Sequence, residues 1–154
     1  MDEITYDRSV WIGAPREAVF EYFTDPEKLT RWMGSAAQLE PQVGGIFRVD
    51  MNGRDIARGE FVELDPPGRV VFTFGWEAGG APVRPGGSTV EVTLVPEGNG
   101  TSVRLVHRGL AQPLLASHAE GWDHHIDRLV IVAAGGDPGP DPRAKTVIDG
   151  ALSD

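Results

Sequence analysis

The sequence predicts an α+β domain in which a curved antiparallel sheet wraps around one long C-terminal helix. Between residues 46 and 108, hydrophobic side chains alternate with polar ones and turn residues recur about every 8–12 positions, which is typical of a strand meander. From residue 117 to residue 134 the hydrophobic spacing changes to three and four, the period of one helix face. A chain of 154 residues with 40% hydrophobic content is long enough for one such domain.

The N-terminal part of the chain predicts a strand followed by two short helices. Residues 4–12 contain β-branched and aromatic side chains that alternate imperfectly with polar ones, which favours a strand. Pro15 suits the first turn of a helix, because backbone N–H groups there have no partner within the helix and proline has no N–H. Asp25 and Pro26 then provide the N-cap and the first position of a second helix, which Gly34 ends.

The alternating region divides into five expected strands, separated by sequences rich in Gly, Pro, Asn and Asp. These strands cover residues 46–51, 56–64, 70–76, 90–94 and 103–107. Asn52-Gly53 predicts a tight hairpin. The connection at residues 77–87 is expected to be a flexible hairpin loop. The alternative is a lid at the mouth of a cavity, with Arg84 available to an anionic ligand group.

The long C-terminal helix is expected over residues 117–134, and Gly135 with Gly136 should end it. Residues 135–154 are rich in Gly, Pro and acidic side chains, so they are expected to form a mobile tail. The sequence thus divides into a domain at 1–134 and a tail at 135–154.

Charge and composition exclude several classes of function. The chain carries 14 Lys and Arg against 23 Asp and Glu, a net charge of −9, which opposes binding to nucleic acid or to an anionic membrane surface. It contains no cysteine, which excludes disulfides, zinc–thiolate sites and cysteine nucleophiles.

Residues 1–13 do not have the basic and apolar pattern of a leader, and no apolar run approaches the ~18 residues of a membrane span. We expect a cytoplasmic protein without membrane insertion or cofactor. A homodimer is compatible with base rates, although no segment marks an interface.

A curved sheet that diverges from a helix leaves a concave, mostly apolar space, which is how many proteins hold small molecules. The side chains expected on the inner faces are the candidate ligand-binding residues, although plain core packing is an alternative for each of them. They are Trp32, Met51, Phe74, Trp76, His107, Trp122, His125 and Ile126.

Histidines are the candidate catalytic residues. His118, Trp122 and His125 share one helix face, and His107 ends a strand on the apolar side, so His107 or His125 is a candidate general acid or base. A metal site combining a histidine pair with Asp123 or Asp127 is not expected, because adjacent helical residues such as His124 and His125 diverge by about 100°. No nucleophile elbow or paired-carboxylate motif accompanies the histidines.

Segments spread over residues 4–134 resemble START-like, helix-grip proteins of the SRPBCC superfamily, in the AHSA-type branch named after the activator of the heat-shock-protein ATPase. The matching segments are APREAVFEYFTDPEKLTRWMG (14–34), VGGIFRVDM (43–51), ARGEFVELDPPGRVVFTFGW (57–76), VEVTLVPEGNGTSVRLVHRGL (90–110) and EGWDHHIDRLV (120–130). The resemblance implies the helix-grip fold, but the family includes binding proteins, cyclases, hydrolases and stress proteins. The first expectation is binding of a hydrophobic or aromatic small molecule. The alternatives are a cyclase or hydrolase with a histidine acid or base, and a chaperone co-regulator.

Overall fold

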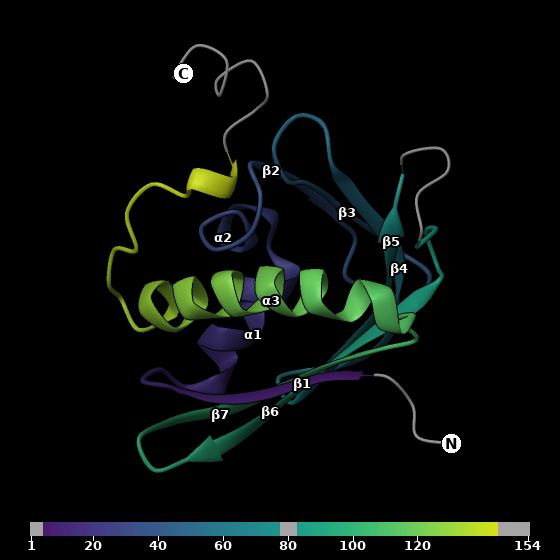
Figure 1. The fold of residues 1–154 in the computed structure, drawn as a ribbon. Helices are drawn as coiled ribbons and strands as arrows, with labels where there is room; N and C mark the ends of the chain where they lie inside the picture. Colours follow the sequence, from purple (N-terminus) through teal and green to yellow (C-terminus); the bar gives the residue numbers. More distant parts are fainter. Residues whose placement is uncertain (1–4, 78–82, 145–154) are drawn as a thin grey trace.

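The computed structural model describes residues 5–77 and 83–144, and it has the predicted helix-grip architecture (Figure 1). One seven-stranded antiparallel sheet, in the order β1-β7-β6-β5-β4-β3-β2, curves around a long helix. The strands are β1 (Thr5–Ile12), β2 (Ala36–Leu39), β3 (Ile46–Asp50), β4 (Ile56–Asp65), β5 (Arg69–Trp76), β6 (Ser88–Glu97) and β7 (Gly100–Arg108). The helices are α1 (Arg16–Thr24), α2 (Pro26–Leu29), α3 (Gln112–Ala133) and the short 3-10 helix η1 (Pro142–Ala144).

The structure differs from the expected elements in several places. Helix α3 begins at Gln112, five residues before the expected start, because Pro113 lies in its first turn. Helix α2 ends at Leu29 rather than near Gly34, and the hydroxyl of Thr30 donates to backbone carbonyls of its only turn. Strand β2 was not expected, since four residues are too few to show an alternating pattern. The turn at Asn52 is wider than a two-residue hairpin.

Asn52 explains the shape of that turn. Its side-chain oxygen accepts hydrogen bonds from the backbone N–H groups of Arg54 and Asp55, at 3.0 and 2.8 Å. The backbone N–H of Met51 donates to the carbonyl of Asp55 at 2.9 Å, which closes a loop over residues 51–55. This β3–β4 loop therefore has a fixed shape, with several of its polar groups satisfied internally.

The sheet bends where β4 pairs with β5. The register between these strands shifts between Phe61 and Glu63, and such an irregularity bends a strand. A Cβ on Gly59 would lie 1.8 Å from the carbonyl oxygen of Thr73, so only glycine allows the two backbones to approach this closely. Because of this curvature, the concave face can enclose the helix and still leave space beside it.

A cluster of aromatic side chains fills the concave face near β3, β4 and β5. Phe47 stacks on Phe72 with ring centroids 4.0 Å apart, and Phe61 meets Phe47 edge to face at 5.9 Å. All three side chains are buried. On the convex face, cross-strand ion pairs join Arg69 to Glu63 and Glu91. Among the described helices, none combines the length and apolar character needed to cross a membrane.

Candidate functional site

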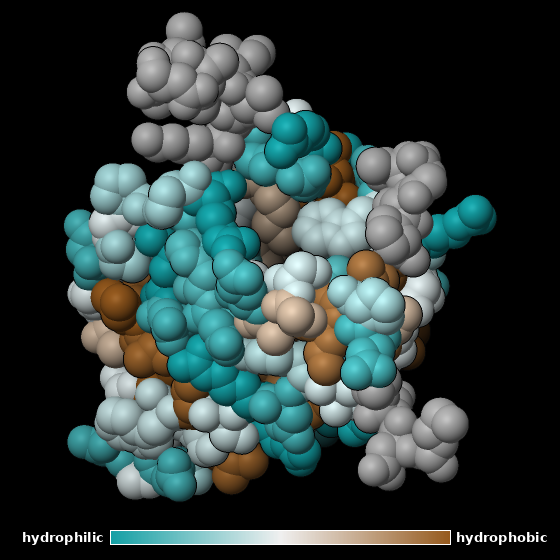
Figure 2. Space-filling model, viewed as in Figure 1, coloured by the Kyte–Doolittle hydropathy of each residue, from teal (hydrophilic) through white to brown (hydrophobic). Residues whose placement is uncertain are grey.

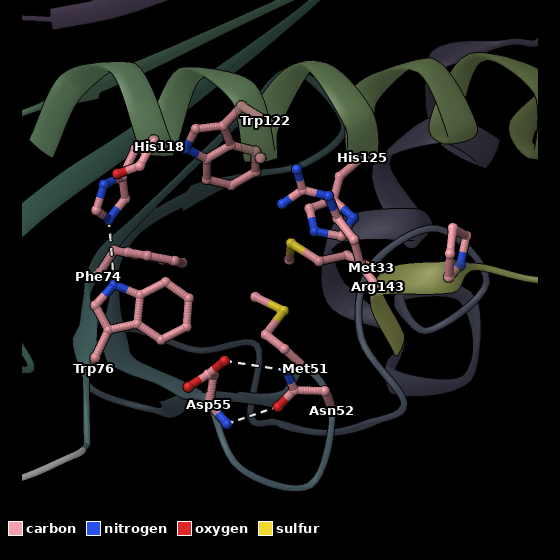
Figure 3. A pocket seen from close by; sticks show the side chains of 13 residues that line it. Met33, Met51, Asn52, Asp55, Phe74, Trp76, His118, Trp122, His125 and Arg143 are labelled. Carbon is pink, nitrogen blue, oxygen red and sulfur yellow. Dashed lines mark hydrogen bonds between the residues drawn. The ribbon is translucent and has the colours of Figure 1, made fainter. Parts of the chain in front are cut away.

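A cavity of about 500 Å³ lies between helix α3, strand β5, the β3–β4 loop and helix η1. In the space-filling view the surface is hollowed beside α3, with a hydrophobic side chain at the bottom of the hollow (Figure 2). Figure 3 shows the side chains that surround this space. The lining residues are Met33, Met51, Asn52, Asp55, Phe74, Trp76, Ser117, His118, Gly121, Trp122, His125, Pro142 and Arg143.

The apolar wall comes from separate elements that the fold brings together. Phe74 and Trp76 alternate along β5, so both point to the concave face, and their rings meet edge to face at 5.4 Å. Trp122 on α3 lies 5.8 Å from Phe74, measured between ring centroids. Met33 and Met51 enter from the segments after α2 and β3 (Figure 3). Large aromatic surfaces and adaptable thioethers together favour an apolar occupant.

A histidine holds Trp76 in place. The indole N–H of Trp76 donates to Nε2 of His118 at 3.2 Å, and Nδ1 of His118 donates to the carbonyl of Leu114 at 2.9 Å. These two bonds define the neutral Nδ1–H tautomer of His118. His118 was not among the expected site residues, although its shared helix face with Trp122 and His125 was a signal that could have found it.

His107 holds Trp122 in a similar way but lies behind the cavity wall. Its Nδ1 accepts from the indole N–H of Trp122 at 2.9 Å, and its Nε2 donates at 2.7 Å to the hydroxyl of Ser88. That hydroxyl donates to the carbonyl of Phe74, also at 2.7 Å. Burial, with a smaller contribution from nearby His118, lowers the pKa of His107 to about 3. Since both ring nitrogens are engaged, the geometry assigns His107 to positioning Trp122 and leaves it no nitrogen for a substrate.

His125 is the expected catalytic candidate that lines the cavity. Its Nδ1 donates to the carbonyl of Trp32 at 3.1 Å, while its Nε2 makes no hydrogen bond to the residues that the structure describes. Burial lowers its pKa to about 4, although the Asp141 carboxylate opposes that shift. His125 is therefore neutral at pH 7, and its Nε2 lone pair is a hydrogen-bond acceptor for a bound molecule.

Residues 135–144 dock on α3, and this part of the expected tail forms one side of the cavity. Asp141 accepts a hydrogen bond from Nε2 of His124 at 2.7 Å, and its carboxylate lies 3.6 Å from Nε of Arg128. Arg128 also donates to the carbonyl of Gly139 at 2.8 Å. Pro142 and Arg143, which follow, lie at the cavity mouth. The remaining residues of the expected tail, 145–154, lie outside the described residues.

The same contacts create a cluster with donor groups suitable for a metal. One ligand atom each from His124, His125 and Asp141 lie within 4.8 Å of one another, whereas Asp123 and Asp127, the carboxylates considered with the histidines, bond to Arg8. The guanidinium of Arg128 already lies against the carboxylate of Asp141, which opposes the approach of a second cation. We therefore interpret the cluster as the ion-pair contact that docks residues 135–144.

Replacing Asp141 tests this docking. In Asp141→Ala, the backbone N–H of Arg143 loses its acceptor, which lies at 2.9 Å, and His124 loses its partner. We expect hydrogen exchange of the Arg143 amide to accelerate roughly tenfold, since a charge-assisted bond is worth about 1.5 kcal/mol. The control is Asp127→Ala, which removes an exposed α3 carboxylate that pairs with Arg8. Equal exchange rates in both variants would contradict the docking role of Asp141.

The expected ligand-binding residues divide into two groups. Met51, Phe74, Trp76, Trp122 and His125 line the cavity, whereas Trp32, Arg84, His107 and Ile126 do not. Trp32 and Ile126 are buried in the core. Arg84 is exposed on the connection between β5 and β6, and residues 78–82 of the expected lid lie outside the described residues. Met33 and Arg143 were not among the expected site residues. Met33 falls within the helix expected to end at Gly34, where a buried side chain is not distinguished from one that borders a cavity, and Arg143 lies in a Gly- and Pro-rich segment without a periodic pattern.

A long helix gripped by a curved sheet, with a cavity beside the helix, is the arrangement of START-like, helix-grip proteins. The family model "Activator of Hsp90 ATPase homolog 1-like protein" matches residues 13–134, and the chain belongs to this family. A search of curated proteins found no match.

Solved structures support the same assignment. An AHSA1-like protein from Rhizobium etli is 46% identical, with a TM-score of 0.73, and the match covers 92% of this chain and 88% of that one. CalU16 from Micromonospora echinospora is 25% identical, with a TM-score of 0.74 and coverage of 92% and 71%. An HSP90 activator from Plasmodium falciparum is 24% identical, with a TM-score of 0.71 and coverage of 84% and 95%, and this likeness concerns the fold alone.

Proposed function

We propose that this protein binds a small, largely apolar molecule with an aromatic body in the cavity beside α3. The observation that carries the proposal is a space of about 500 Å³ whose wall contains Phe74, Trp76 and Trp122. This volume lies within the range of about 300–1,000 Å³ that is usual for small-molecule sites. Fold and family membership are compatible with ligand binding, and they leave the identity of the ligand open.

The hydrogen bonds made by the two tryptophans of the wall favour an aromatic ligand. Trp76 and Trp122 each give their indole N–H to a histidine of the protein, so their ring surfaces, and not their N–H donors, are available to an occupant. Their orientations are also set before binding, which lowers the entropy cost of association. Polar side chains such as Asn52 and Ser117 occupy other parts of the lining, where they can orient a ligand.

A fluorescent probe tests the proposal with a variant that fills the cavity. N-phenylnaphthylamine is neutral and aromatic, and its emission rises in apolar surroundings. In Met51→Trp a larger side chain takes up part of the space, and we expect the dissociation constant of the probe to rise at least tenfold, or about 1.4 kcal/mol. The control is Val95→Trp, because Val95 is 51% exposed and does not line the cavity.

The outcomes separate cavity binding from surface adsorption. Tight probe binding to the wild type and to Val95→Trp, with weak binding to Met51→Trp, is the expected result. Equal affinity in all three proteins would place the probe elsewhere on the surface, and failure of the wild type to bind the probe would contradict the proposed function.

A further inference from the structure

We infer that the molecule held in this cavity carries an anionic group, such as a carboxylate or sulfonate, and that Arg143 binds this group at the cavity mouth. The inference rests on the proposed function and narrows its ligand class to aromatic acids. Arg143 thus takes the role that the sequence suggested for Arg84, which is exposed and outside the lining.

The position of Arg143 is built by two elements. It belongs to η1, and its backbone N–H is held by the carboxylate of Asp141 at 2.9 Å. Its side chain reaches α3 near Gly121, where a Cβ would lie 4.0 Å from a terminal guanidinium nitrogen of Arg143, an ordinary van der Waals distance. Figure 3 shows the guanidinium beside the cavity, in the region of Trp122 and His125. The docked segment therefore places this cation over the apolar space, against α3 near Gly121.

The guanidinium retains donors for a ligand. Its carboxylate partner is Glu120, whose oxygen lies 3.4 Å from one terminal nitrogen, and the two side chains are 45% and 76% exposed. An ion pair this exposed is weak and is easily exchanged. Because a guanidinium has five N–H donors, one long contact leaves most of them free for a carboxylate or sulfonate.

An acidic group on the opposite side of the cavity orients the ligand. Asp55, on the β3–β4 loop, lies across the space from Arg143 and accepts a hydrogen bond from Asn52 at 3.0 Å (Figure 3). Its carboxylate repels an anion, whereas Arg143 attracts one. Nε2 of His125, on the Arg143 side, can accept a hydrogen bond from a hydroxyl or protonated group of the ligand. The anionic end is thus directed to the side of α3 and η1, and the aromatic body to Phe74 and Trp76.

Two probes with the same aromatic skeleton test the inference. Anilinonaphthalenesulfonate carries a sulfonate that N-phenylnaphthylamine lacks, and both report binding by fluorescence. In Arg143→Gln we expect the dissociation constant of the sulfonate to rise about tenfold, while that of the neutral probe changes less than about twofold. The matched control is Arg84→Gln, which removes an exposed arginine outside the lining and should leave both affinities unchanged.

The result separates this inference from the proposed function. If wild type binds both probes and Arg143→Gln weakens neither, or weakens both equally, the anion site is overturned while cavity binding stands. An equal loss of sulfonate affinity in Arg84→Gln would also overturn it, because general surface charge would then explain the effect. If wild type binds neither probe, the proposed function fails together with the inference.

Discussion

Lowering the pH from 7 to 4 is expected to remove several kcal/mol from the free energy of unfolding, because two buried histidines resist protonation. Burial lowers the pKa of His107 to about 3 and that of His125 to about 4, against a usual value of 6.5. In the unfolded chain both imidazoles take up protons near pH 6.5, so the unfolded state gains protons first as the pH falls. Stability is therefore complete above pH 6.5 and declines below it, by about 3 kcal/mol for each histidine at pH 4.

Urea unfolding at half-unit steps from pH 7 to pH 4 measures this effect. The interval from pH 6.5 to pH 5 isolates the imidazoles, because hydrogen bonds and nearby cations hold the pKa values of Asp7, Glu91 and Asp141 below their usual range despite burial. His107→Asn keeps an acceptor near the indole N–H of Trp122 and lacks the titrating ring. Its free energy should fall less steeply with pH than that of the wild type. Identical slopes would contradict the assignment of His107 as a buried neutral group.

Trp32→Ala is expected to cost about 3–5 kcal/mol of unfolding free energy, the range for a fully buried aromatic side chain. Trp32 is 1% exposed, and its ring meets Phe23 edge to face at 5.3 Å. Its indole N–H donates to the carbonyl of Tyr22 at 2.9 Å, and the substitution removes this hydrogen bond. The backbone carbonyl of Trp32 also accepts a hydrogen bond from Nδ1 of His125, so we expect the loss of this packing to disturb His125 at the edge of the cavity as well.

Trp11→Ala provides the comparison for the same chemical change on the surface. Trp11 is 47% exposed, and its indole donates to the carbonyl of Glu97 at 3.0 Å. We expect this variant to lose less than about 1.5 kcal/mol, measured by the same urea unfolding. If Trp32→Ala cost no more than Trp11→Ala, then Trp32 would not be a core residue.

The sequence predicted the fold well because its signals are local and periodic. Alternation along Phe72, Phe74 and Trp76 defined a strand face, and the spacing of Trp122, Ile126 and Leu129 defined a helix face. These patterns do not tell which side chains of an inner face fill the core and which border a cavity. Trp122 and Ile126 share a helix face and both belong to the buried core cluster, yet of the two only Trp122 also lines the cavity.

The parts of the site that the sequence did not predict depend on contacts between distant segments. Arg143 reaches the cavity because contacts of Gly139 and Asp141 dock its segment on α3, and a sequence rich in Gly and Pro gives no periodic signal for such contacts. The sequence did not predict the role of His107 either. Its position on the apolar face suggested a catalytic group, but the hydrogen bonds to Trp122 and Ser88, which use both ring nitrogens, appear only in three dimensions.

The four tryptophans allow one direct test of ligand binding in this cavity. Each indole N–H gives a separate nitrogen–proton NMR signal, which Trp→Phe variants assign, and Trp76 and Trp122 line the cavity while Trp11 and Trp32 do not. On titration with anilinonaphthalenesulfonate, we expect the signals of Trp76 and Trp122 to move to saturation and those of Trp11 and Trp32 to stay nearly unchanged. If the probe saturates the protein while the signals of Trp76 and Trp122 stay still, binding in the cavity beside α3 is contradicted.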